Sequence, residues 1–200
     1  MRIHKTIQLL VKTCVFFIFI HSTTSMGITP DEAKSIYFDA ARTGNTELLR
    51  TFHDAGIPLD QADDKGYSAL ILSAYAGHKE SVNYLIDAGA NTCHKDKQGR
   101  TALMGAIFKG EFKITRLLIT QSCDVNTASN TGQTAAMFAA LFNRDETLNA
   151  LYNNGADLDI VDYQGNSVES VAQSQGSHNI TALLNNYKTK AQNTKSTSNH

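Results

Sequence analysis

A spacing of 33 residues recurs along most of this 200-residue chain and constrains its fold more than any other feature. Four glycines stand at this interval, namely Gly66, Gly99, Gly132 and Gly165. A hydroxyl residue follows each of them two positions later, at Ser68, Thr101, Thr134 and Ser167. A fixed period of this length is typical of repeat proteins, in which each unit stacks on its neighbours. The spacing therefore predicts a repeat array.

One repeat reads as a turn followed by two short helices. The glycine of each turn can take a positive φ without a Cβ clash. The hydroxyl two residues later can accept a hydrogen bond from the first free amides of a helix. A glycine such as Gly77 ends the first helix, and Gly89 ends a second helix expected over 81–88. Because one helix pair cannot bury its apolar face alone, the units must stack into a solenoid.

The segments 63–70 and 84–91 resemble the consensus of the ankyrin repeat, whose own period is 33 residues. The resemblance implies an all-α repeat solenoid of helix-turn-helix units joined by β-turn or hairpin loops. Five units fit the chain, at 30–62, 63–95, 96–128, 129–161 and 162–194. They define a repeat domain over 30–187, with the terminal units as caps.

The two ends of the array depart from the pattern. The first unit has Ala33 in place of the turn glycine and opens with Thr29, Pro30 and Glu32, a capping box with proline at the first helical position. The fifth unit loses the leucine of the family pattern, and we expect it to fray. Residues 188–200 are polar and without periodicity, which predicts a disordered tail.

Residues 1–25 have the layout of a secretory signal peptide. Three basic residues open the segment, at Arg2, Lys5 and Lys12. An apolar run covers 14–20, and small polar residues follow it, so we expect cleavage after Ser25 or, alternatively, after Gly27. The competing interpretation is an uncleaved anchor or a buried strand, but the run is short against a hydrocarbon core of about 30 Å. We expect export to the periplasm or out of the cell, without membrane attachment after cleavage.

The charge balance argues against nucleic acid as a partner. The chain carries 18 Lys and Arg against 19 Asp and Glu, a net charge of −1, and loss of the signal segment makes it −4. Ordinary nucleic-acid binders use excess cations to displace the counterions of the phosphates. The 42% of hydrophobic residues are enough for a folded core.

The sequence contains no nucleophile elbow, P-loop, dinucleotide fingerprint or zinc-protease motif. The one Cys and His grouping worth weighing as a metal site is Cys93-His94 with Cys123, and it lacks the spacing of metal ligands. We therefore expect a non-enzymatic protein with no cofactor and no metal.

Cys93 and Cys123 remain as a pair after signal removal, in a compartment that favours disulfides. The repeat register places them in adjacent units but three residues out of step. A disulfide requires Cα atoms within about 7 Å, which a sequence cannot establish. A Cys93–Cys123 disulfide and two unrelated buried thiols both remain open.

The ankyrin resemblance implies a protein partner, bound through the turn tips and the exposed end of each first helix. Carried over by register, the candidate partner-binding residues are Tyr67, Tyr75, Arg100, Phe108, Lys109, Gln133, Leu141, Phe142 and Tyr163. The apolar members stand where the repeat itself does not require a hydrophobic residue, as in an interface hot spot. In the alternative interpretation Tyr75, Phe108 and Phe142 pack between neighbouring repeats.

These features together predict a monomeric adaptor that is exported and docks on another protein. Exported bacterial ankyrin proteins of similar size include some associated with peroxide defence, so support of such an enzyme is one specific form. The alternatives are an inhibitor or immunity protein that blocks a periplasmic enzyme, and a secreted effector that binds host proteins.

Overall fold

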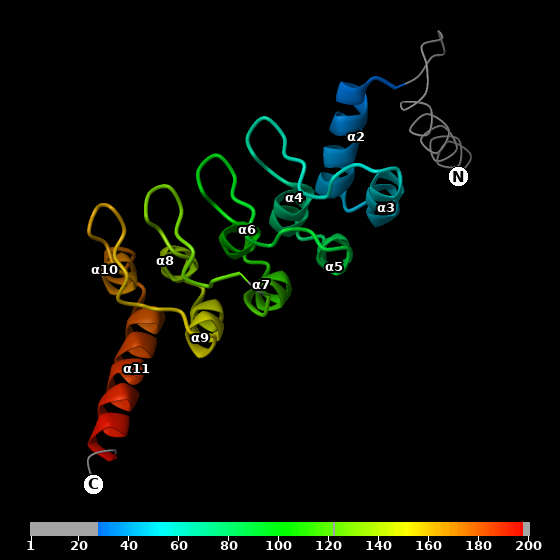
Figure 1. The fold of residues 1–200 in the computed structure, drawn as a ribbon. Coiled ribbons are helices and arrows are strands. Elements are labelled where there is room, and N and C mark those ends of the chain that lie inside the picture. Colours follow the sequence, from blue (N-terminus) through cyan, green and yellow to red (C-terminus); the bar gives the residue numbers. More distant parts are fainter. Residues whose placement is uncertain (1–27, 122, 198–200) are drawn as a thin grey trace.

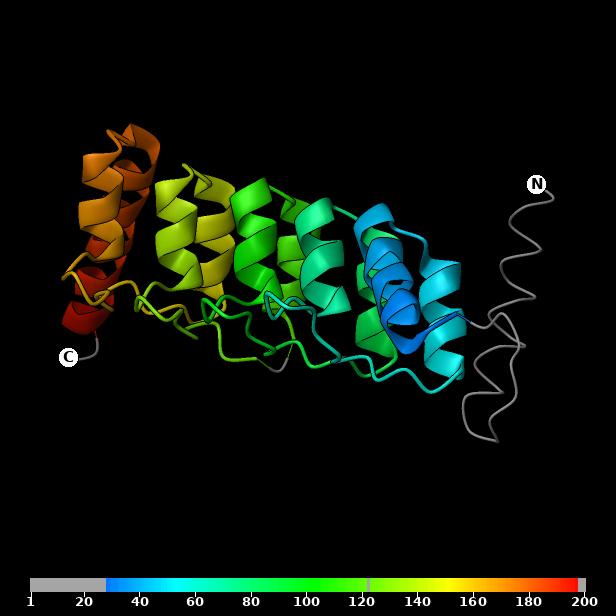
Figure 2. The same cartoon turned by 90° about the horizontal axis from the view of Figure 1, so that it is seen from above.

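The computed structural model describes residues 28–121 and 123–197, which form a curved array of paired helices (Figure 1). The predicted signal peptide, residues 1–25, lies outside the described residues. One row holds the first helix of each unit: α2 (Pro30–Thr43), α4 (Ala69–Ala76), α6 (Ala102–Lys109), α8 (Ala135–Leu141) and α10 (Val168–Ser174). The other row holds the second helices: α3 (Thr46–Asp54), α5 (Lys79–Asp87), α7 (Phe112–Ile119), α9 (Asp145–Asn153) and α11 (His178–Thr197). Figure 2 shows the two rows side by side, and the predicted all-α repeat solenoid is confirmed.

Local side chains begin the helices where the sequence predicts. The Thr29 hydroxyl accepts from the backbone N–H of Glu32 at 3.2 Å, and the Glu32 carboxylate accepts from the N–H of Thr29 at 2.8 Å, which completes the capping box. The N–H and the hydroxyl of Thr29 lower the pKa of Glu32. The hydroxyls of the repeat pattern cap the other first helices, namely Ser68, Thr101, Thr134 and Ser167.

Left-handed residues end most of the first helices. Gly77 caps α4 with a φ of 82° and Gly110 caps α6 with a φ of 78°. The corresponding position after α8 holds Asn143, whose φ is 52°. Asparagine tolerates this conformation better than most side chains, so the repeat geometry survives the loss of the glycine. Gly89 follows the end of α5, as predicted.

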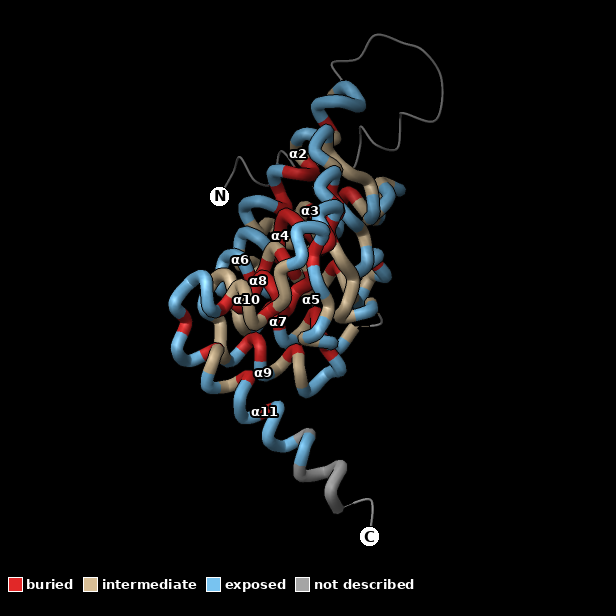
Figure 3. Tube along the Cα trace, turned by 90° about the vertical axis from the view of Figure 1, so that its left-hand side faces the viewer, coloured by how far each residue is buried: buried red, intermediate tan, exposed pale blue. Residues whose placement is uncertain are grey.

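The core runs along the array between the two helix rows, as Figure 3 shows in red. Small residues on the first helices, such as Ala74, Ala106 and Ala139, are completely buried and allow neighbouring helices to approach closely. Larger side chains, such as Leu85 and Leu148, fill the space from the second row. Each unit therefore buries its apolar face against the next one, as a solenoid requires.

The prediction of a disordered tail from residue 188 is wrong for the portion that the structure describes. Helix α11 continues past Tyr187 and ends at Thr197. No glycine or proline interrupts 178–197, and lysine, alanine and glutamine are good helix formers. The Lys188 ammonium also lies 2.7 Å from the Glu169 carboxylate, which fastens the extension to α10. Within the described residues, no helix is long and apolar enough to cross a membrane.

Candidate interaction groove

The loops between units share one turn geometry, set by an acceptor side chain. The Asp63 carboxylate accepts from the backbone N–H of Lys65 at 2.9 Å and of Tyr67 at 3.0 Å. The carboxylates of Asp96 and Asp162 accept from the equivalent amides of their own loops, and the Ser129 hydroxyl replaces the carboxylate in the third loop. Side chains that bond to amides two residues ahead stabilise tight turns. Each loop is therefore a preformed finger.

The fingers are hydrogen-bonded to one another. The N–H of Lys97 donates to the carbonyl of Lys65 at 3.1 Å, and the N–H of Tyr163 donates to that of Thr131 at 3.0 Å. The N–H of Asn130 forms the intermediate link, to the carbonyl of Gln98. In Figure 1 the fingers project in parallel from the row of first helices. They make one continuous wall rather than separate mobile loops.

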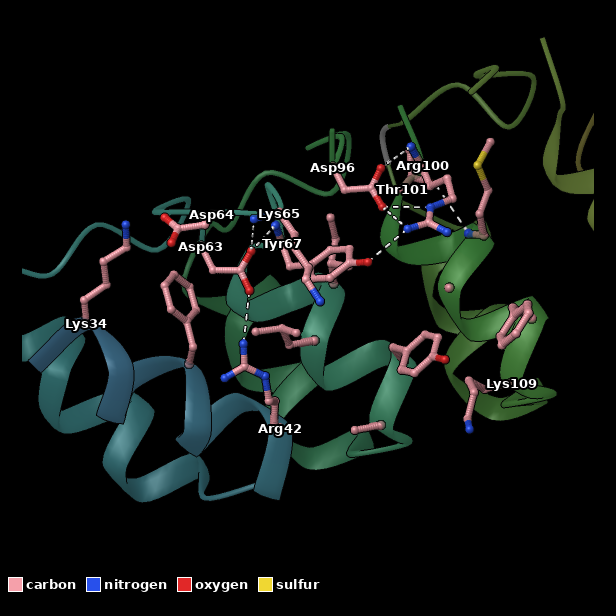
Figure 4. Close-up of a pocket in the computed structure, with 18 of the residues that line it drawn as sticks. Lys34, Arg42, Asp63, Asp64, Lys65, Tyr67, Asp96, Arg100, Thr101 and Lys109 are labelled. Carbon is pink, nitrogen blue, oxygen red and sulfur yellow. Dashed lines mark hydrogen bonds and ion pairs between the residues drawn. The ribbon is translucent and has the colours of Figure 1, made fainter. Parts of the chain in front are cut away.

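A groove of about 1040 Å³ lies between this wall and the helices α2, α4 and α6 (Figure 4). Its apolar lining comes from the first helices and includes Phe38, Ile71, Leu72, Met104 and Phe138. Its charged lining comes from the fingers and the helix ends, where Figure 4 shows Arg42, Asp63, Lys65, Asp96, Arg100 and Lys109. The site is thus an apolar trough with a polar rim.

Three aromatic side chains form a ladder, which we define as Tyr75 on α4, Phe108 on α6 and Phe142 at the C-cap of α8. The rings of Tyr75 and Phe108 stack with centroids 5.7 Å apart, and Phe108 meets Phe142 edge to face at 4.9 Å. Nevertheless 45% of Tyr75 and 41% of Phe108 remain exposed. The Lys109 ammonium lies 5.1 Å from the centroid of the Tyr75 ring, a cation–π contact. The rings pack between repeats and also present a surface.

Arg100 holds the finger end of the groove in place. One terminal nitrogen of its guanidinium lies 2.8 Å from the Asp96 carboxylate, which is almost fully buried, and donates to the Tyr67 hydroxyl at 3.0 Å. Arg42 on α2 has a similar role at the preceding finger, because its guanidinium lies 3.0 Å from the Asp63 carboxylate. These arginines are neutralised by acids of the turns, so their role in the free protein is to fix the rim.

The structure brings five of the predicted binding residues together as lining of the groove. They are Tyr67, Tyr75, Arg100, Phe108 and Lys109. Phe142 extends the ladder past the groove, and Leu141 lies beside it, half-buried. Gln133 and Tyr163 belong to the third and fourth fingers, where Tyr163 is 80% exposed. These four residues are not among those that line the groove.

A family model for ankyrin repeats matches the chain in three overlapping copies, at residues 10–96, 37–129 and 89–162. The chain belongs to the ankyrin repeat family. Ankyrin repeats generally mediate protein–protein interaction and are typically non-catalytic. A comparison with curated proteins finds no significant match. The family matches stop at residue 162, but α10 and α11 pack on α8 and α9 as the earlier pairs pack on one another.

Sequence reasoning missed the region of the ankyrin groove that lies below the fingers. Asp31, Lys34 and Phe38 of α2 line one end of it, and Gly105 of α6 lines its floor. The α2 residues precede the first recognisable turn glycine, so the repeat pattern gave no signal for them. Gly105 shares a repeat column with Leu72 and Phe138, which was a signal that could have found it.

Cys93 and Cys123 form a disulfide in the structure, with their Cα atoms 5.3 Å apart. The bond connects the loop after α5 with the loop after α7 and so joins the second ankyrin unit to the third. Neither cysteine lines the groove. Across 28–121 and 123–197, no cluster of three or more His, Cys, Asp or Glu residues is arranged to hold a metal ion.

Two histidines of this ankyrin array bond to backbone carbonyls: His78 connects the second unit to the first, and His94 bonds within the second unit. His78 Nε2 lies 2.8 Å from the carbonyl oxygen of Arg42, and His94 Nε2 lies 3.0 Å from that of Gly66. A ring nitrogen must carry the proton to make each of these bonds. The two side chains therefore have a structural task in the array.

Proposed function

We propose that this ankyrin protein is an exported, monomeric and non-enzymatic adaptor that binds a protein partner in its groove. The aromatic ladder is the observation that carries the proposal. Tyr75 and Phe108 expose nearly half of their surface beside an apolar trough, although folded monomers rarely leave contiguous apolar surface open without a use. Aromatic side chains flanked by cations are the residue types that dominate binding energy at protein interfaces.

Two observations support export as an element of this proposal. The first 25 residues have the charge and hydropathy layout of a signal peptide. A disulfide such as Cys93–Cys123 is typical of proteins in oxidising compartments, since such bonds are rare where glutathione keeps thiols reduced. Periplasm and extracellular medium both satisfy these conditions.

The specific role that we propose is support of an exported partner enzyme, for which a peroxide-defence enzyme is one candidate. An inhibitor or immunity protein would use the same groove but would block its target. A secreted effector would use it on a host protein. The effect on the partner's activity separates the first two roles, and the location of the protein separates the third.

The test is capture of partners from the exported fraction of the native host. The full chain serves as bait, and the variant Tyr67→Ala/Phe108→Ala/Phe142→Ala serves as the groove-deficient bait. Phe112→Ala, on α7 in the other helix row, is the matched control. Circular dichroism first establishes that all three baits are equally folded.

A partner retained by wild type and by Phe112→Ala, but lost by the triple variant, supports the proposal. Retention of the same proteins by all baits, or of none, contradicts it. With the partner in hand, its activity is measured with and without a stoichiometric amount of the ankyrin protein. An adaptor leaves that activity unchanged or raised, whereas an inhibitor lowers it.

A further inference from the structure

The sixth position after the turn glycines Gly66, Gly99 and Gly132 lines the groove, and in one of these units it carries no side chain. Leu72 on α4 and Phe138 on α8 occupy it in their units, and both line the groove while 8% and 9% exposed. In the unit between them the residue is Gly105, in the middle of α6. This column of the groove lining therefore lacks a side chain between two bulky apolar ones.

Neither backbone conformation nor crowding requires a glycine there. Gly105 lies within a regular helix and is not among the residues of positive φ. A Cβ at this position would meet only Tyr75, at 3.8 Å from its Cβ and its Cδ2, which is ordinary van der Waals contact. Glycine inside a helix is less stable than alanine. The chain thus carries a destabilising residue where a larger one would fit.

We infer that Gly105 keeps open an apolar socket that receives one bulky apolar side chain of the partner, an inference that rests on the groove being the binding site. Met104 and the exposed rings of Tyr75 and Phe108 line the groove with Gly105, and Tyr75 is the residue next to it. Leu72 and Phe138 hold the same repeat column in the neighbouring units and line the same groove. A partner residue seated there is surrounded by apolar atoms, which is the environment of a binding hot spot.

The charges around the socket indicate which type of residue should stand beside the apolar residue in the partner. Figure 4 shows Arg100 and Lys109 toward opposite ends of α6. Asp96 neutralises Arg100, whereas Lys109 forms no ion pair with any acid of the described chain and instead lies over the Tyr75 ring. The unneutralised charge next to the socket is therefore positive. Asp31 and Asp64 also line the groove, but at its α2 and first-finger end.

Charge complementarity therefore predicts the kind of partner segment that binds at the socket. In this segment a bulky apolar residue stands next to Asp or Glu, and the carboxylate lies toward Lys109. The chain's own first segment does not meet this description. Its apolar run over 14–20 is accompanied by Arg2, Lys5 and Lys12, with no acidic residue. Such a segment would bring positive charge to Lys109.

The test uses a random-peptide display library panned against the full chain. Enriched peptides are synthesised with a fluorophore and titrated by fluorescence anisotropy. We expect enrichment of one Phe, Leu, Ile, Met or Trp beside Asp or Glu. Gly105→Leu gives α6 the side chain that α4 has in the same column, and it should weaken binding about 10- to 100-fold. Lys109→Glu should weaken it most at low salt.

Two further variants make the test independent of folding defects. Gly105→Ala adds only a Cβ, so it should raise the melting temperature and weaken binding less than Gly105→Leu does. Gly105→Met fills the socket with a flexible side chain and should weaken binding as Gly105→Leu does. A filled variant that melts no lower than wild type but binds more weakly supports the socket.

The contrary outcomes are distinct. If the filled variants bind the enriched peptides as wild type does, while the variant Tyr67→Ala/Phe108→Ala/Phe142→Ala loses them, the socket is wrong and the adaptor proposal stands. If no peptide is enriched, or binding survives all of these variants, both fail. Enrichment of Lys or Arg beside the anchor overturns the charge assignment. Self-association that Gly105→Leu abolishes in sedimentation velocity would make a second copy the occupant.

Discussion

The rings of Tyr75 and Phe108 stack across two ankyrin units, with 15° between their planes and 5.7 Å between their centroids. Each ring is held by its neighbour and still exposes more than two fifths of its surface. Packing between repeats and presentation to a partner are therefore compatible in the same residues. Because the rings are already ordered in the free protein, less conformational entropy is lost when a partner binds.

Truncation of Phe108 should separate binding from stability. Because much of its ring is already in solvent, Phe108→Ala should lower the free energy of unfolding by only about 1 kcal/mol. Met104, one turn earlier on α6, is 1% exposed, and Met104→Ala should cost about 2–5 kcal/mol. Urea unfolding followed by circular dichroism measures both. Equal losses for the two variants would mean that Phe108 is a core residue.

Reduction of the Cys93–Cys123 bond should destabilise the middle of the array. The bond closes a loop with a sequence separation of 30 residues, for which chain-entropy arguments give about 3–4 kcal/mol. We expect a lower melting temperature in dithiothreitol. The double variant Cys93→Ser/Cys123→Ser should melt at the reduced value and show no further response to dithiothreitol. An identical melting temperature with and without reductant would contradict the bond's contribution.

Gly89 and Gly99 both have a positive φ, but they should differ in how well they tolerate a side chain. Gly89 has a φ of 94° and open space where a Cβ would lie, so Gly89→Ala should cost about 1–2 kcal/mol from the backbone alone. A Cβ at Gly99 would in addition lie 2.6 Å from the backbone nitrogen of Asn130 in the next finger. Gly99→Ala should therefore cost about 3 kcal/mol or more. Denaturant unfolding ranks the two variants.

Acid should weaken the last finger through Asp162. The backbone N–H of Asn166, and then its side-chain amide, hold the pKa of Asp162 below its ordinary value of 3.8, against burial, which raises it. Because the folded-state pKa is the lower one, this stabilisation is complete above 3.8 and is lost as the pH falls through the folded value.

The measurement for Asp162 is the free energy of unfolding in urea at about pH 6 and about pH 3. Asp162→Asn should lower stability at the higher pH and lose less than wild type on acidification. Asp87→Asn, which replaces an exposed carboxylate of α5, is the control and should lose as much unfolding free energy between the two pH values as wild type does. A parallel pH dependence for Asp162→Asn and wild type would show that Asp162 does not stabilise the finger in this way.

Local chemistry explains why so much of the fold was predictable. The N-caps Ser68 and Thr101 act on amides three residues away, and the glycine caps act within one turn, so a sequence displays them directly. The repeat period then fixes which units are neighbours. The tail from residue 188 was wrongly predicted to be disordered because the extension of α11 is held by Lys188 and Glu169, which are 19 residues apart and belong to different columns.

The repeat register predicted several residues of the site, but it did not predict the hollow that they line. Register placed Tyr75 and Phe108 in one column and Phe142 one position past it at the end of the next first helix, and the structure arranges the three rings as a ladder. The hollow between α2, α6 and the fingers depends on how the whole array curves, which no single column encodes. Thus the sequence did not indicate Lys34 as a groove residue, while Tyr163 proved to lie outside the residues that line the groove.

The central claim is that the partner contacts the groove and not the other row of helices. Site-specific photocrosslinking tests it with one matched pair of positions. The photoreactive amino acid p-benzoylphenylalanine replaces Phe108 in the ladder or Phe112 at the start of α7, and cells of the native host are irradiated. Each position exchanges one phenyl side chain for a larger one, so the two proteins differ only in the face that reacts.

We expect a covalent adduct with one protein from position 108 and none from position 112. Competition by unlabelled wild type should remove that adduct. Adducts from position 112 alone, or of equal yield from both positions, would contradict the claim, because the partner would then contact a surface other than the groove.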